Sequence, residues 1–148
     1  MTIDHETIRL TRTLSADRAS VWAAYADAAL RSRWSVPEGE AMVIDSDDLR
    51  SGGSSRYRCG SPELLEFVGD IEYVQVAHSR SVVHTETVRT GGEPLSTGLV
   101  TWTFTEVPEG TEVCVTAQVA SFVGPGMLEG TRNGHRIALE QLDGFLRG

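Results

Sequence analysis

The sequence predicts one α+β domain over residues 1–148, in which a curved antiparallel sheet of six or seven strands wraps around one long C-terminal helix. Three observations predict this fold. A strand pattern and two short helical patterns come first, and apolar residues then alternate with polar ones from about residue 40 to about residue 120. After Gly124 the apolar spacing returns to the period of a helix. A curved sheet around that helix buries all of these apolar faces together.

The first part of the chain predicts one strand and two short helices. Residues 3–14 alternate between apolar and polar side chains, which is typical of a half-buried strand. Ser15 offers a hydroxyl that can cap the amphipathic helix in ADRASVWAAYAD. Asp27 can cap a second helix, which we expect to end near Trp34 and before Pro37.

Six further strands and the last helix are predicted from two changes of period. Each strand carries alternate side chains that form one mainly apolar face. These sets are Met42 and Ile44; Tyr57 and Cys59; Phe67, Gly69, Ile71 and Tyr73; Val82, His84, Glu86 and Val88; Val100, Trp102 and Phe104; Val113, Val115, Ala117 and Val119. The last two strands are joined by a hairpin at EVPEGTEV. The apolar stripe of the helix is Met127, Thr131, His135, Ala138, Leu139, Leu142, Phe145 and Leu146.

Composition argues against several classes of function. The net charge of −8, from 13 basic and 21 acidic residues, disfavours nucleic acid and anionic lipid surfaces as partners. No apolar run reaches the roughly 20 residues of a membrane helix, and the N-terminus does not resemble a secretion signal, so we expect a cytoplasmic protein without membrane contacts. Cys59 and Cys114 are expected to be reduced thiols. Asp45, Asp47 and Asp48 are expected to form a solvated strand end, and neither a metal nor a cofactor is predicted.

Two adjacent glycines in DLRSGGSSRYRC raise the question of a phosphate-binding loop. Such a loop lies between a strand and a helix and usually carries a lysine. Here an alternating strand follows Gly52 and Gly53, and the chain contains no lysine. We therefore expect a tight turn with positive φ and no nucleotide site.

Two histidines are candidates for acid–base chemistry. His135 lies on the inward stripe of the last helix, where it is either a hydrogen-bonded structural residue or a group that contacts ligand or transfers protons. His84 shares its face with Val82 and Glu86, although Val83 competes for the inward position. A pairing of His135 with His84 or Glu86 across the interior cannot be decided from the sequence.

The order and spacing of these motifs, from about residue 7 to residue 146, resemble the SRPBCC superfamily, which has the START-like or helix-grip fold. The most similar branch contains homologues of the activator of heat-shock-protein ATPase. The matching motifs are Val21-Trp22, Trp34, the turn with Asp48, Arg50, Gly52 and Gly53, Phe67-x-Gly69, and the hairpin with Glu106, Gly110 and Thr111. The last helix departs from the pattern, since Gly134-His135 stands where such proteins often have Gly-Trp.

The resemblance implies a cavity between the sheet and the long helix. Its expected walls are Tyr57, Phe67, Tyr73, Trp102 and His135, with Trp34 near the mouth. The leading hypothesis is a protein that binds a small apolar or amphipathic molecule in this cavity. One alternative is a polyketide cyclase-like or dehydratase-like enzyme that uses His135 with an inward carboxylate or Tyr57, and another is an interaction module for a chaperone. The sequence leaves open whether the protein forms a homodimer.

Overall fold

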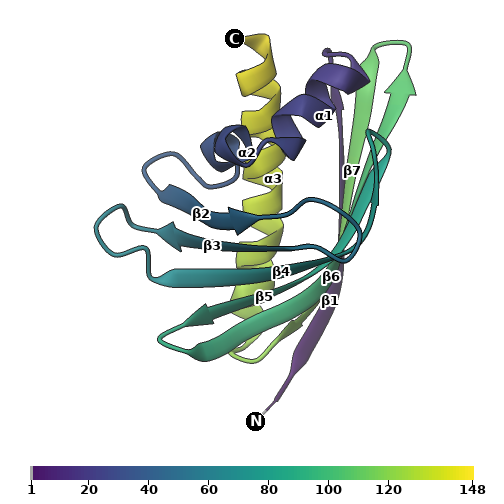
Figure 1. The fold of residues 1–148 in the computed structure, drawn as a ribbon. Helices are drawn as coiled ribbons and strands as arrows, with labels where there is room; N and C mark the ends of the chain where they lie inside the picture. The colour runs from purple at the N-terminus through teal and green to yellow at the C-terminus, as the bar shows by residue number, and fades with distance from the viewer. Residues whose placement is uncertain (1) are drawn as a thin grey trace.

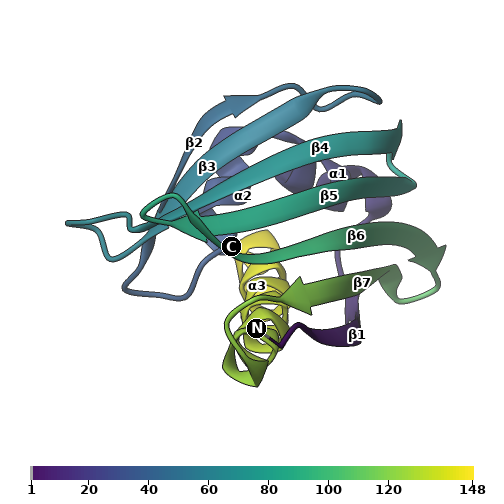
Figure 2. The ribbon, with the colours of Figure 1, turned by 90° about the horizontal axis from the view of Figure 1, so that it is seen from below.

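The computed structural model describes residues 2–148 and has the predicted helix-grip architecture over that range. One antiparallel sheet, in the order β1-β7-β6-β5-β4-β3-β2, curves around the long helix α3 (Figures 1 and 2). The strands are β1 (Asp4–Leu14), β2 (Ala41–Asp47), β3 (Ser54–Gly60), β4 (Phe67–Ala77), β5 (Ser81–Thr90), β6 (Glu93–Val107) and β7 (Gly110–Ser121). The helices are α1 (Arg18–Ala26), α2 (Ala28–Trp34) and α3 (Pro125–Arg147).

The start of α1 differs from the prediction. Its N-cap is Asp17 instead of Ser15, because Asp17 is the extended residue next to the helix and its carboxylate accepts a hydrogen bond of 2.7 Å from the amide of Ser20. Asp27 caps α2 as predicted, through a bond of 3.2 Å from the amide of Leu30. The two caps fix the corner between the helices, which lies over one end of the sheet (Figure 1).

A β-bulge in β2 overturns the prediction for Asp47. Strand pairing shifts register between Ile44 and Ser46, which adds one residue and moves the next side chains to the opposite face. Asp47 therefore points into the protein, with its side chain only 9% exposed, and is not part of a solvated strand end. Asp45 and Asp48 are exposed, as predicted.

The glycine pair forms the predicted turn between β2 and β3. Gly52 has a positive φ of 85°. At Gly53 the reason is steric, since a Cβ there would lie 2.0 Å from the carbonyl oxygen of Asp48. The amide of Gly52 donates to the carbonyl of Tyr73 at 2.8 Å, and the amide of Gly53 donates to that of Arg50 at 2.8 Å. Both amides are thus used inside the protein and are not directed at an anion.

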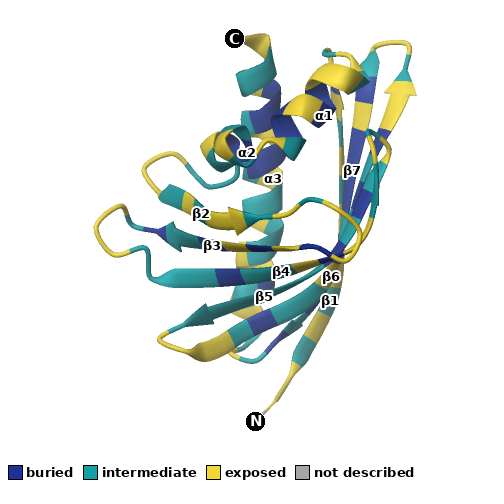
Figure 3. Cartoon of the chain, in the orientation of Figure 1, coloured by how far each residue is buried: buried dark blue, intermediate teal, exposed yellow. Residues whose placement is uncertain are grey.

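The tightly packed part of the core lies between α1, α2, α3 and the middle of the sheet. Five aromatic rings, with centroids 5.2–6.4 Å apart, interlock there: Trp22, Tyr25, Trp34, Trp102 and Phe104. Figure 3 shows buried residues on α1, on the neighbouring part of α3 and along β7. Helix α3 packs against β1, β7, α1 and α2, and α2 packs against β2, so the inner face of β3–β5 is left without a helix directly on it. None of the helices within residues 2–148 has the length and apolar character of a membrane span.

Candidate functional site: the cavity between the sheet and helix α3

A cavity of about 490 Å³ lies between the inner face of the sheet, α2 and α3. Its size is within the range of roughly 300–1,000 Å³ that is common for small-molecule sites. The structure brings together all six residues that were predicted to form it: Trp34, Tyr57, Phe67, Tyr73, Trp102 and His135. Trp34 differs in its position, because it is only 2% exposed and packs on Tyr25 and Trp102, so it belongs to the inner wall and not to the mouth.

Most of the wall is apolar. Phe67, Ile71 and Val88 point inward from β4 and β5. They are only half-buried, because they face the cavity and are not covered there by other side chains. Further apolar groups come from β2, from β6 and from α3. These are Met42, Ile44, Val100, Met127, Ile137 and Ala138. The arrangement can hold an apolar body of moderate size.

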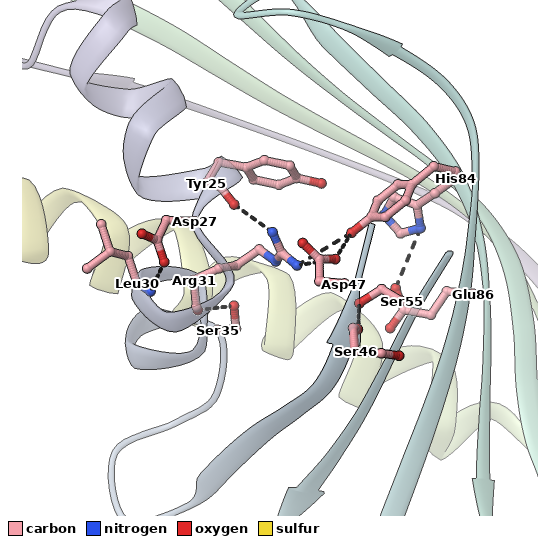
Figure 4. Close-up of polar contacts among 11 residues, drawn as sticks. Tyr25, Asp27, Leu30, Arg31, Ser35, Ser46, Asp47, Ser55, His84 and Glu86 are labelled. Carbon is pink, nitrogen blue, oxygen red and sulfur yellow. Dashed lines mark hydrogen bonds and ion pairs between the residues drawn. The ribbon is translucent and has the colours of Figure 1, made fainter. Parts of the chain in front are cut away.

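A buried ion-pair network forms one polar group of the site (Figure 4). The guanidinium of Arg31, on α2, donates to the Asp47 carboxylate at 2.9 Å and to the carbonyl of Tyr25 at 2.7 Å. The hydroxyl of Tyr73 donates to the same carboxylate at 2.6 Å. Burial is the largest cause of the raised pKa of Tyr73, and its bond to Asp47 adds to the shift.

The sequence reasoning missed this network. Arg31 lies three residues before Trp34, so the two side chains share one face of α2. Because Trp34 was expected to face inward, the same spacing could have identified Arg31 as inward. The inward position of Asp47 had no such signal, since it depends on the bulge.

A second polar group, which we call the Glu86 cluster, consists of Tyr57, His84, Glu86 and His135. The hydroxyl of Tyr57, on β3, donates a short hydrogen bond to the Glu86 carboxylate on β5, across the intervening strand β4. Gly69 makes this reach possible, because a Cβ at this position would lie 2.0 Å from the Tyr57 ring. Burial is the largest cause of a strongly raised pKa of Tyr57, so this hydroxyl remains a proton donor.

The structure settles the face of His84. It points inward and is 3% exposed, whereas Val83 is only half-buried. Its Nδ1 lies 3.3 Å from the carbonyl oxygen of Thr85 and 3.8 Å from Oε1 of Glu86 (Figure 4). Because a carbonyl can only accept, Nδ1 carries the proton and Nε2 holds the lone pair.

His135 faces the same cavity from α3. Its ring lies edge-on to Trp102, with 6.3 Å between centroids. Burial lowers the pKa of His135 and that of His84, so both are neutral at pH 7. No direct hydrogen bond within residues 2–148 joins His135 to His84 or Glu86, so the pairing that the sequence left open is not formed in this structure.

The site has no arrangement that is typical of a metal centre. Within the described residues, no group of three or more His, Cys, Asp or Glu side chains could hold a metal ion. Cys59 lines the cavity, and burial raises the pKa of its thiol to about 11, which keeps it protonated and weakly nucleophilic at neutral pH. The side chains that line the cavity can supply apolar contact, hydrogen bonding and proton transfer.

Comparison with known proteins places this geometry in a family. The sequence model described as "Activator of Hsp90 ATPase homolog 1-like protein" matches residues 15–147. No curated protein has a sequence that matches the chain significantly.

Several solved structures share the fold. A protein from Rhizobium leguminosarum is 23% identical, with a TM-score of 0.83 over 99% of this chain and 97% of the other. A protein from Rhizobium loti is 27% identical, with a TM-score of 0.78 over 98% and 99% of the two chains. DynU16, from the dynemicin biosynthetic locus, is 19% identical, with a TM-score of 0.73 over 95% of this chain and 47% of the other.

Proposed function

The chain belongs to the Activator of Hsp90 ATPase homolog 1-like family, as its motifs predicted, and we propose that it binds a small amphipathic molecule in the cavity between the sheet and α3. One observation carries this proposal. The cavity has mainly apolar walls, but the Glu86 cluster presents polar atoms to it that have no hydrogen-bond partner within residues 2–148.

The hydrogen bonds of the Glu86 cluster support an amphipathic ligand over a purely apolar one. Oε1 of Glu86, Nε2 of His84 and both ring nitrogens of His135 have no hydrogen-bond partner within residues 2–148. Fully enclosed side-chain nitrogen and oxygen atoms of this range all have one, so these atoms are open to the cavity. A purely apolar ligand would cover them without replacing their hydrogen bonds to water, which is unfavourable.

The direct test is native mass spectrometry of the protein purified from the organism that encodes it. We expect a bound small molecule whose mass is lost on denaturation. Added to the purified protein, that molecule should displace a fluorescent apolar probe. His135→Trp, which fills the cavity, should reduce binding, whereas His5→Trp on the exposed part of β1 should not. A protein that carries no molecule and takes up no apolar probe would contradict the proposal.

A second candidate function is proton-transfer catalysis of the polyketide cyclase or dehydratase kind. The observation that favours it is the convergence of one carboxylate, one tyrosine hydroxyl and two neutral histidines on one side of the cavity. Glu86 would be the base and His135 the proton donor or acceptor. The molecules recovered from the native protein and from Glu86→Gln distinguish the two functions. Identical molecules support binding alone, whereas accumulation of a different molecule in the variant supports catalysis.

A further inference from the structure

We infer that the ligand carries a cationic head group that donates hydrogen bonds, such as a primary ammonium, and that this group binds at Glu86. The inference rests on the proposed function and makes its ligand class specific. It is drawn from the charges and the hydrogen-bonding directions around the cavity.

The charges that line the cavity leave one carboxylate without a cation. Arg31, Glu40 and Glu86 are the charged side chains of the described wall apart from the histidines. The guanidinium of Arg31 is neutralised by Asp47 at 2.9 Å, and both side chains are about 10% exposed. Glu40 lies exposed at the rim, before β2. Glu86 remains, and its nearest basic group among residues 2–148 is His84, whose Nδ1 is 3.8 Å away.

Hydrogen bonding in the Glu86 cluster requires a ligand that donates. The hydroxyl of Tyr57 donates its hydrogen bond to Glu86, and the Nδ1–H group of His84 points to the carbonyl of Thr85. Of the open atoms, the carboxylate oxygen Oε1 and the Nε2 lone pair of His84 are acceptors, and neutral His135 offers one acceptor nitrogen and one N–H donor. Acceptors therefore outnumber donors by three to one. A primary ammonium has three donors and no acceptor, which matches the three acceptors.

A carboxylate head group fits less well. It would meet neutral donors such as the hydroxyl of Tyr25, but within residues 2–148 no unpaired guanidinium lines the cavity to neutralise it. It would also share an apolar enclosure with Glu86, where like charges repel more strongly than in water. The cavity should therefore prefer an amine over a fatty acid of the same length.

Three probes with one tail and different head groups test this: decylammonium, decanol and decanoate. Each is titrated at pH 7.5, below its aggregation concentration, against a bound fluorescent apolar probe. We expect decylammonium to bind tightest and decanoate weakest, with a difference on the order of tenfold or more. Glu86→Gln should remove the preference for the amine, whereas Glu72→Gln, which removes an exposed carboxylate of β4 that does not line the cavity, should keep it. His135→Trp should weaken the binding of the amine, which separates the cavity from attraction to the acidic surface.

Every outcome decides the question. Equal binding of the amine and the alcohol, tighter binding of decanoate, or an amine preference that persists in Glu86→Gln overturns this inference and leaves the proposed function in place. Failure of the protein to take up the fluorescent apolar probe or any of the three decyl compounds overturns the proposed function itself. If Glu86→Gln does not fold, the ranking of the three probes on the native protein still decides the inference.

Discussion

The two sides of the interior differ in whether their polar side chains have hydrogen-bond partners within the protein. Near α2, the guanidinium of Arg31, the carboxylate of Asp47 and the hydroxyl of Tyr73 satisfy one another, and tightly packed aromatic rings lie beside them. On the inner face of β3 to β5, Glu86 and His84 have polar atoms that are without hydrogen-bond partners in residues 2–148 and are directed at the cavity. The first arrangement stabilises the fold, whereas the second has unused capacity for a ligand. Closed and open hydrogen bonding thus distinguish the two sides of the interior better than residue type does.

The largest expected effect comes from breaking the closed network. Arg31→Met leaves the Asp47 carboxylate buried without its cation, so the free energy of unfolding should fall by about 3–5 kcal/mol. Arg33→Met, on the exposed face of the same helix, should change it by less than about 0.5 kcal/mol. Urea unfolding of both variants measures the difference. A loss below about 1 kcal/mol for Arg31→Met would show that the network is not essential for stability.

A smaller effect on stability is expected when the space that Gly69 leaves for the Tyr57 ring is filled. Gly69→Ala places a methyl group where the Tyr57 ring now lies, so the ring must move and its bond to Glu86 must break. Overpacking of this kind costs about 1–3 kcal/mol. Gly144→Ala is the control, because a Cβ there meets open space on α3 and should stabilise the helix by roughly 0.5–1 kcal/mol. Thermal unfolding compares the two, and equal stability of both variants would mean that Tyr57 adjusts freely.

The buried histidine His84 of the Glu86 cluster should also make the stability of the protein depend on pH. The pKa of His84 is lowered in the folded protein because the side chain is buried. Below the unfolded pKa of about 6.5, the unfolded chain binds a proton that the folded chain does not, so stability is full above this pH and falls as the pH decreases. As the pH falls below about 6.5, the slope should rise toward a maximum of about 1.4 kcal/mol per pH unit for one such histidine.

The control for this slope is His84→Gln, which removes one titrating group and should reduce the dependence to the contribution of His135, whose pKa burial also lowers. The carboxylates whose pKa values are lowered, Asp17, Asp45 and Asp143, act at lower pH, near and below about 4. Unfolding measured at half-unit steps between pH 7.5 and 5 therefore isolates the histidines. A native protein whose stability is constant over this window would show that His84 protonates without cost.

The smallest effect on stability, and the clearest one on binding, is expected for His135→Trp. The larger indole enters existing space, so stability should be unchanged or rise by on the order of 1 kcal/mol, while uptake of an apolar fluorescent probe should drop. Probe titrations and thermal melts of the variant and of the native protein check both parts. Equal probe affinity in two folded proteins would remove His135 from the binding wall, and a loss of about 1–3 kcal/mol would mean that the site is already tightly filled.

Periodicity predicted the order of the elements and the inward faces of the strands and of α3, because a two-residue or a 3.6-residue repeat assigns each side chain to a face. The family resemblance added the cavity between them, although Trp34 lies in its inner wall and not at the expected mouth. Periodicity could not place Asp47, since a bulge in β2 reverses the face after Ile44. Nor could it join Tyr57 to Glu86, which are 29 residues apart and meet across Gly69 only when three strands are paired. The tertiary structure decided which polar groups satisfy one another and which stay open to the cavity, because that depends on distances between strands that no local pattern contains.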